Sequence, residues 1–425
     1  MTLQALVFGM AGAVAATAAT GAMPVTFHKD VEPILQARCQ ECHRAGEIAP
    51  MSFMSYDLTR PWAKAIKGAV LARKMPPWLA DAHYGKFSND RSMSQSEINT
   101  LAAWADSGAR EGEAKDAPKP REFVMGWAIG KPDQVFEMPK AVEIPATGIV
   151  DYTYMVIPSG FTEDKWIQMA EARAGAREAM HHVIIFIRPP GGTFLKNAPI
   201  GEPYIPRSRG EGGLPGELLV GFAPGLPPTE CKEGEAKLVP AGSDFVLQLH
   251  YTPNGHATSD KTKLGVIFAK EPPKYRVMTV NAINAYFKIP AGDGNYEVTS
   301  KNTLKEDVKL VSMMPHMHLR GKDFEYRAVY PTGETQTLLR VPKYDFNWQL
   351  SYVLDRELLL PKNTRIECTA HYDNSVNNPA NPDATKEVRW GDQTFEEMMI
   401  GWFDVAVDAT KDPSNVRRIA TFERN

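Results

Sequence analysis

The sequence predicts a multidomain protein in which a small all-α domain is followed by two all-β sandwich domains. With 425 residues, the chain is too long for one hydrophobic core and fits roughly two to four domains. Its 33 prolines and 32 glycines suit many short strands joined by turns. Helical periodicity is found only before a charged, proline-containing stretch at residues 106–122, and short strand patterns follow that stretch.

The composition limits the classes of function. A net charge of -3 and a pI near 6.4 leave no basic excess, so we expect no nucleic-acid partner. The apolar share of 43% is that of an ordinary globular chain. Composition therefore indicates ordinary folded domains and gives no reason to expect a nucleic-acid-binding protein.

Residues 1–22 predict an export signal. They carry no charged side chain, are rich in Ala and Gly, and end in the small residues Ala19-Thr20-Gly21-Ala22. The positive start of a typical signal peptide is missing, and a weakly hydrophobic membrane anchor is the alternative. We expect cleavage near Ala22, a periplasmic or secreted protein, and no stable membrane span after cleavage.

Cys39-Gln40-Glu41-Cys42-His43 has the C-x-x-C-H spacing that attaches a c-type haem. The two thiols can add to the haem vinyl groups, and the adjacent histidine can then ligate the iron. A disulfide between Cys39 and Cys42, or half of a zinc site, would leave His43 unexplained. The motif therefore predicts one covalent haem c.

Helical patterns surround this motif. Residues 30–38 predict a short helix before it. After it, Ser94 and Glu97 form a capping box that opens a helix with Ile98, Leu101 and Trp104 on one face. Between the two helices, Met75 is followed by two prolines, which stiffen its loop.

This order of elements resembles a small class I cytochrome c domain over roughly residues 24–112. The resemblance implies that Cys39 and Cys42 attach the haem and that His43 and Met75 are the axial ligands. Met51 and Met54 compete with Met75 for the sixth position. We favour Met75 because the helix expected to pack on the haem follows it.

Beyond the helical part, short strand patterns recur at regular intervals, as in all-β sandwiches. Proline residues near 272 divide them into two sets. The predicted organisation is a signal peptide (1–22), a haem domain (23–112), a linker (113–122), an N-terminal sandwich (123–272) and a C-terminal sandwich (273–425).

Three histidines in the first sandwich are candidate metal ligands. His181 and His182 begin an apolar run, and neighbouring residues on a regular strand face opposite ways. Both can therefore bind one ion only at a strand start or a bulge. His250 lies on a strand in which it shares a face with Gln248; alone, it would be interpreted as a core histidine.

The stretch from Met313 to His318 brings two histidines and several thioethers together in the second sandwich. An extended backbone puts Met314, His316 and His318 on one face. Imidazole and thioether ligands together favour copper. A methionine-rich core strand with incidental histidines is the alternative.

The whole set resembles the copper type II, ascorbate-dependent monooxygenase family, which includes peptidylglycine α-hydroxylating and dopamine β-monooxygenases. The resemblance covers roughly residues 130–410 and implies two jelly-roll-like sandwiches with two coppers. An electron-transfer copper would be held by His181, His182 and His250. An oxygen-binding, catalytic copper would be held by His316, His318 and Met398, with Met399 as the adjacent alternative.

This sequence differs from the peptide-amidating members of that family at the positions that bind the substrate carboxylate. Met314, Ile400 and Trp402 stand at those positions, and none of them can bind a carboxylate by charge or paired hydrogen bonds. They predict a pocket for a less polar molecule. Glu396 and Glu397 are interpreted as solvated, and Cys231 and Cys368 as a possible disulfide.

The resemblances together predict a haem- and copper-dependent monooxygenase. It would hydroxylate a C–H bond of a small organic substrate with O₂. Electrons from an external donor, a small reductant or a redox protein, would pass through the haem and one copper to the other. The alternative is a non-catalytic haem and copper electron carrier or a copper-binding sensor.

Overall fold

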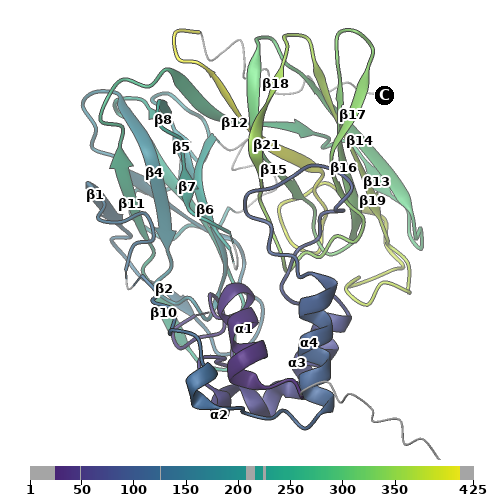
Figure 1. The fold of residues 1–425 in the computed structure, drawn as a ribbon. Helices are drawn as coiled ribbons and strands as arrows, with labels where there is room; N and C mark the ends of the chain where they lie inside the picture. The colour runs from purple at the N-terminus through teal and green to yellow at the C-terminus, as the bar shows by residue number, and fades with distance from the viewer. Residues whose placement is uncertain (1–23, 48, 125, 207–215, 224–225, 412–425) are drawn as a thin grey trace, which may run out of the picture.

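The computed structural model describes residues 24–47, 49–124, 126–206, 216–223 and 226–411. Helices come first along the chain, and every regular element after η3 (Ala114–Asp116) in the described residues is a strand, in agreement with the predicted β-sandwiches (Figure 1). The predicted signal peptide, residues 1–22, lies outside the described residues. In the parts of the chain described, every helix is too short or too polar to cross a lipid bilayer.

The helical part packs around Trp104, which is fully buried. The capping box of α4 is confirmed, since Ser94 accepts from the Glu97 N–H and the Glu97 carboxylate accepts from the Ser94 N–H. The apolar face predicted for α4 is buried as well. The elements are η1 (Phe27–Val31), α1 (Glu32–Arg38), α2 (Tyr56–Thr59), η2 (Arg60–Trp62), α3 (Ala63–Leu71), α4 (Gln95–Asp106) and η3 (Ala114–Asp116).

The segment predicted as a linker lies along α1. The Gln36 side chain donates to the Lys119 carbonyl at 3.1 Å, and Arg121 donates to the Gln36 carbonyl at 2.8 Å. Arg121 also pairs with Glu41 inside the C-x-x-C-H motif at 2.6 Å. The linker is therefore attached to the helical part at several points.

The N-terminal sandwich has a four-stranded sheet in the order β3-β9-β5-β6. It packs on β1, β11, β4 and β8, which belong to a larger sheet, and apolar residues of both fill the space between them. The strands are β1 (Gln134–Glu137), β2 (Val142–Ile144), β3 (Thr153–Pro158), β4 (Lys165–Arg173), β5 (Met180–Arg188), β6 (Glu217–Phe222), β7 (Thr229–Glu230), β8 (Glu235–Val239), β9 (Asp244–Tyr251), β10 (Thr258–Asp260) and β11 (Lys263–Phe268).

The C-terminal sandwich has a four-stranded sheet in the order β14-β19-β16-β17, which packs on β12, β21, β15 and β18. Its core is rich in aromatic side chains and methionines. The strands are β12 (Tyr275–Ile283), β13 (Lys288–Ile289), β14 (Tyr296–Thr303), β15 (Val308–His316), β16 (Gly321–Val329), β17 (Thr335–Val341), β18 (Tyr352–Leu360), β19 (Arg365–Tyr372), β20 (Val388–Arg389) and β21 (Ile400–Asp408).

One sheet continues through both sandwiches. Strand β8 pairs in parallel with β12, where Glu235 lies opposite Tyr275 and Ala236 opposite Arg276. The sheet runs β1-β11-β4-β8-β12-β21-β15-β18. The predicted division near Pro272 therefore separates two cores, while backbone hydrogen bonds join the sandwiches across it.

The possible disulfide between Cys231 and Cys368 is not formed in this structure, where both thiols are free. Cys231 packs with Val277 and Ala406 on one face of the long sheet. Cys368 is buried with Phe403 in the core on the opposite face. Strands β12 and β21 stand between the two sulfur atoms.

The helical part contacts both sandwiches (Figure 1). The loop from α3 to α4 reaches the C-terminal sandwich, where Trp78 and Phe87 pack against Tyr352 with ring centroids 5.0 and 5.5 Å apart. On the other side, Glu47 pairs with Arg177 of the N-terminal sandwich at 2.8 Å. The helical part therefore bridges the two sandwiches.

The Trp78 contact gives a first prediction. Trp78→Ala removes a half-buried ring packed on Tyr352, so we expect the free energy of unfolding to fall by about 2–4 kcal/mol. The loop between α3 and α4 should also become easier to cleave by protease. Thermal unfolding and limited proteolysis measure the two effects.

Trp62→Ala is the matched control. Trp62 is 40% exposed, so its loss should cost less than about 1 kcal/mol. Equal losses of stability in the two variants would contradict the docking role of Trp78.

Candidate metal centres and the cavity between the sandwiches

Three histidines of the N-terminal sandwich converge at the start of β5. The pairing of β5 with β9 shifts its register between Met180 and His182, and His182 then lies opposite His250. This irregularity at the strand start lets His181 and His182 lie on the same side. One ring nitrogen from each of His181, His182 and His250 lies within 4.8 Å of the others.

Burial keeps these imidazoles neutral. It lowers the pKa of His181 to about 4 and that of His250 to about 3, and the pKa of His182 falls well below its usual value. Nε2 of His181 and Nδ1 of His250 are buried without a hydrogen-bond partner. Three neutral histidines with ring nitrogens this close together, two of them with an unpartnered nitrogen, fit a transition-metal ion.

Aromatic rings hold this cluster from both sides. Tyr152 stacks on His250 with a centroid distance of 4.4 Å, and Phe346 stacks on His181 at 5.2 Å. Phe346 comes from the C-terminal sandwich, and its ring also lies 5.9 Å from His318. One phenylalanine therefore contacts histidines of both sandwiches. The sequence offered no signal for either aromatic residue.

His316 and His318 lie at the end of β15 with their rings perpendicular and 5.3 Å apart. Nδ1 of His316 lies 2.9 Å from Oε1 of Gln349, and Nδ1 of His318 lies 3.2 Å from the Glu396 carbonyl. Because each of these oxygens can only accept a hydrogen bond, the ring proton lies on Nδ1. The lone pair of Nε2 is then available to bind a metal ion. Burial lowers the pKa of His316, and lowers that of His318 to about 3.

Glu397 is not solvated as the sequence suggested; it is fully buried beneath His318. Its two carboxylate oxygens accept from the backbone N–H groups of His318 (2.8 Å) and Arg320 (2.7 Å). Burial raises the pKa of Glu397 to about 8, although these two donors act in the opposite direction. Glu397 therefore fixes the backbone that carries His318.

The two neighbouring methionines point in opposite directions. Met398 lines a cavity together with His316, whereas Met399 is fully buried in the core of the C-terminal sandwich. The backbone carbonyl of Met398 is fixed by the Tyr372 hydroxyl at 2.7 Å. Of the two thioethers, the Met398 side chain lies on the side of His316.

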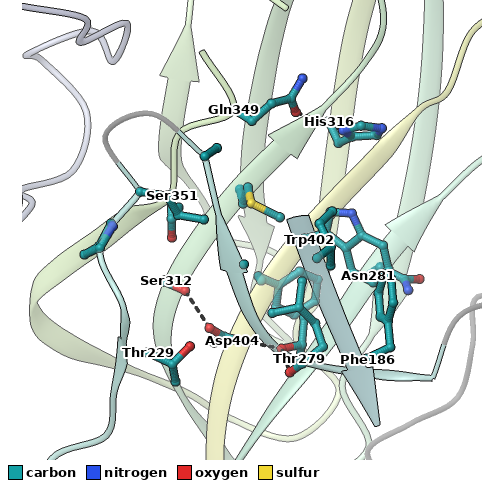
Figure 2. A pocket seen from close by; sticks show the side chains of 18 of the residues that line it. Phe186, Thr229, Thr279, Asn281, Ser312, His316, Gln349, Ser351, Trp402 and Asp404 are labelled. Atoms are coloured by element: carbon teal, nitrogen blue, oxygen red, sulfur yellow. Dashed lines mark hydrogen bonds between the residues drawn. The ribbon is translucent and has the colours of Figure 1, made fainter. Parts of the chain in front are cut away.

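The cavity has a volume of about 770 Å³ and lies between the sandwiches. His182 and His316 both line it, as do all three residues predicted for a substrate pocket: Met314, Ile400 and Trp402. Figure 2 shows His316 and Gln349 at one end and a polar group around Asp404 at the other, with Trp402 between them. The cavity is large enough for a small organic molecule.

The C-x-x-C-H motif follows α1 directly. Cys39 and Cys42 are free thiols, and burial raises the pKa of Cys39 to about 12 and that of Cys42 above its usual value. Nδ1 of His43 lies 3.2 Å from the Met51 carbonyl, and the imidazole stacks on Phe53. A bond from Nδ1–H to that carbonyl leaves Nε2 as the basic nitrogen, which suits an iron ligand.

The three candidate thioethers differ in position. Met51 packs against the helical core beside His43, and Met54 follows on the same loop. Met75 is half-buried after α3, in a cis peptide bond with Pro76.

Comparisons with known proteins identify no family. No family model matches the chain, and no curated protein matches it. A structure of infectious bursal disease virus, Gx strain, is 10% identical and covers 69% of this chain and 77% of its own, with a TM-score of 0.20. The PBCV-1 protein VP54, fitted into a reconstruction of the virophage Sputnik, is 8% identical. The match covers 68% of this chain and 100% of VP54, with a TM-score of 0.26.

PNGase F, a glycosylasparaginase from Flavobacterium meningosepticum, is 9% identical and covers 64% of this chain and 97% of its own, with a TM-score of 0.25. At these TM-scores the likenesses carry no argument about this chain. The candidate sites therefore stand on their own geometry.

The buried histidines predict sensitivity to acid. Their pKa values are lower in the folded chain than in the unfolded one, so the unfolded chain binds more protons as the pH falls below about 6.5. We expect the melting temperature of the metal-free protein to be constant above pH 7 and to fall by several degrees per pH unit from pH 6.5 towards 4. Calorimetry across this range measures it; a flat profile would contradict the buried, neutral state.

Glu397→Gln tests how the His318 backbone is held. Glutamine has one acceptor oxygen, so one of the two backbone N–H groups would face an NH₂ group. We expect the free energy of unfolding to fall by about 1–3 kcal/mol, as measured by denaturant titration above the pKa of Glu397, where the group is a carboxylate. Glu387→Gln is the control, because Glu387 is an exposed partner of Arg389 and should cost less than about 1 kcal/mol.

Proposed function

We propose that this chain is an exported haem- and copper-dependent monooxygenase that hydroxylates a C–H bond of a small organic molecule with O₂. The observation that carries the proposal is the cavity between the sandwiches. The Met398 thioether and the His316 imidazole line this cavity, and so does His182 of the three-histidine cluster.

The three-histidine cluster supports an electron-transfer copper. Three neutral imidazoles can bind both copper oxidation states. His181 and His250 keep unpartnered buried nitrogens, a costly feature that an ion would relieve. Tyr152 stacks on His250 and Phe346 stacks on His181, so aromatic packing holds two of the three donor rings in place.

The second set of donors, His316, His318 and Met398, supports a catalytic copper next to the substrate cavity. His316 and His318 present Nε2, since Gln349 and the Glu396 carbonyl take the other ring nitrogens. Met398 supplies a thioether, a ligand that favours Cu(I). Copper bound at the two sites would supply electron transfer and the activation of dioxygen.

The protein's own residues bind the substrate and keep water away. Trp402, Ile400 and Met314 form an apolar wall beside His316, where they can orient a carbon chain or ring. None of them can pair with a carboxylate, so a glycine-extended peptide is disfavoured. Glu397 and Gln349 hold the two histidines in place during turnover.

The helical part supports a cytochrome c-like role as electron entry. Cys39 and Cys42 provide the thiols for attachment, and His43 has an oriented ring with Nε2 available. A haem attached there would supply single electrons. Glu47, four residues beyond His43, pairs with Arg177, which lies four residues before His181. This contact brings the loop after the haem motif to the loop before the three-histidine cluster.

The alternative function, an electron carrier or copper sensor without catalysis, needs no substrate cavity. The 770 Å³ cavity beside His316 and Met398 favours the enzyme.

Metal and haem analysis of the purified full-length protein tests the proposal. We expect one haem and two coppers per chain, and faster haem reoxidation by O₂ when a substrate is present. His250→Ala should remove one copper and leave the haem. Haem without copper, or zinc in place of copper, would overturn the proposal.

His256→Ala is the matched control, because His256 is exposed and is not part of the three-histidine cluster. It should keep both coppers. Met398→Leu should abolish O₂ consumption while haem reduction continues; unchanged O₂ consumption would exclude Met398 as a ligand.

A further inference from the structure

Three rows of side chains cross the wall of the cavity. On β12, β21 and β15, the pairing aligns Thr279, Asp404 and Ser312 in one row. The next row on the same face is Asn281, Trp402 and Met314, and the third is Ile283, Ile400 and His316. All nine residues line the cavity.

The first row belongs to a hydrogen-bonded group around a buried lysine. Lys237 is 1% exposed and donates to the Leu218 carbonyl (3.0 Å), the Thr279 hydroxyl (2.8 Å) and Oδ1 of Asp404 (3.4 Å). An ammonium group has three N–H donors, so Lys237 has none left for a ligand. An anionic substrate group would therefore find no free donor on this lysine.

Hydrogen-bond acceptors, in contrast, remain open at this end of the cavity. Oδ1 of Asp404 is occupied by Lys237 and Thr279. Among the described residues, Oδ2 accepts only from Ser312, at 3.0 Å, and the side chain is 25% exposed. The Ser312 oxygen keeps its own lone pairs. In the next row, Oδ1 of Asn281 is buried without a partner.

The charges of Lys237 and Asp404 compensate each other, so the free oxygen of Asp404 belongs to a neutral ion pair. A neutral donor satisfies such a site at a lower desolvation cost than an ammonium ion would. The apolar row beside His316 lies at the other end.

We propose that the Asp404, Ser312 and Asn281 oxygens line the site for the hydroxyl group of an alcohol, whose single O–H donates to one of them and whose apolar part extends to His316. The inference names the substrate class of the proposed monooxygenase and rests on that function for the reaction, but not for binding.

The strand geometry sets the length of this molecule. Ser312 and His316 are four residues apart on β15, which corresponds to about 13 Å at about 3.3 Å per residue. A hydrogen bond of about 3 Å at the hydroxyl end leaves roughly 10 Å for the carbon frame and whatever His316 holds. A chain of moderate length, not a two- or three-carbon alcohol, fits this span.

The test compares 1-octanol with 1-methoxyheptane, which has the same atoms but no O–H donor. Titration calorimetry on the full-length protein should give about tenfold tighter binding of 1-octanol. Octanoate and octylammonium should both bind more weakly than 1-octanol. Equal binding of alcohol and ether, or tighter binding of either ion, would overturn the proposal.

Asn281→Leu is the decisive variant, since its Oδ1 has no native partner and its removal should not lower the melting temperature. It should reduce the preference for 1-octanol over the ether several-fold. Asn284→Ala, just beyond β12 and outside the cavity, should leave it unchanged. A preference that survives Asn281→Leu would overturn the assigned contact.

These binding measurements need no turnover, so they separate the two proposals. Alcohol-selective binding without copper or O₂ consumption would support the site and refute the monooxygenase. O₂-dependent hydroxylation without selectivity for alcohols would do the reverse.

Discussion

The desolvation of five histidines between two β-sandwiches is the constraint on which the candidate centres depend. If they were exposed to water, these imidazoles would become protonated below neutral pH and would repel one another. Burial lowers their pKa values and keeps them neutral. Burial has a cost, because His181 and His250 keep nitrogen atoms without partners. The rest of the fold must supply that stability, and a sheet shared by both sandwiches supplies a rigid frame.

The two faces of this sheet carry different kinds of side chain. Alternate residues of β12 and β21 point into the core of the C-terminal sandwich, and those between them face the cavity. The two faces of these strands also keep Cys231, which packs on Val277 and Ala406, away from Cys368, which is buried with Phe403. A polar row can therefore lie next to an apolar core without being buried in it.

Features with a short sequence period could be predicted. The capping box of α4, the strand-rich second part and the irregular start of β5 follow from neighbouring residues. Residues brought in by tertiary contacts could not. Phe346, Gln349 and the Lys237–Asp404 pair are ordinary side chains in the sequence, and only the fold brings them to the histidines or the cavity. Glu397 was misjudged because acidic residues are seldom buried, and two backbone N–H groups make it an exception.

The helical part has its own core, yet it is not a detachable module. Trp78 and Phe87 complete the aromatic packing around Tyr352, and Glu47 pairs with Arg177 on the other sandwich. Removing the helical part would expose apolar surface around Tyr352 on one sandwich and leave Arg177 on the other without its Glu47 partner. Apolar surface exposed in this way favours association between molecules, so the two parts are better suited to exist as one chain than as separate proteins.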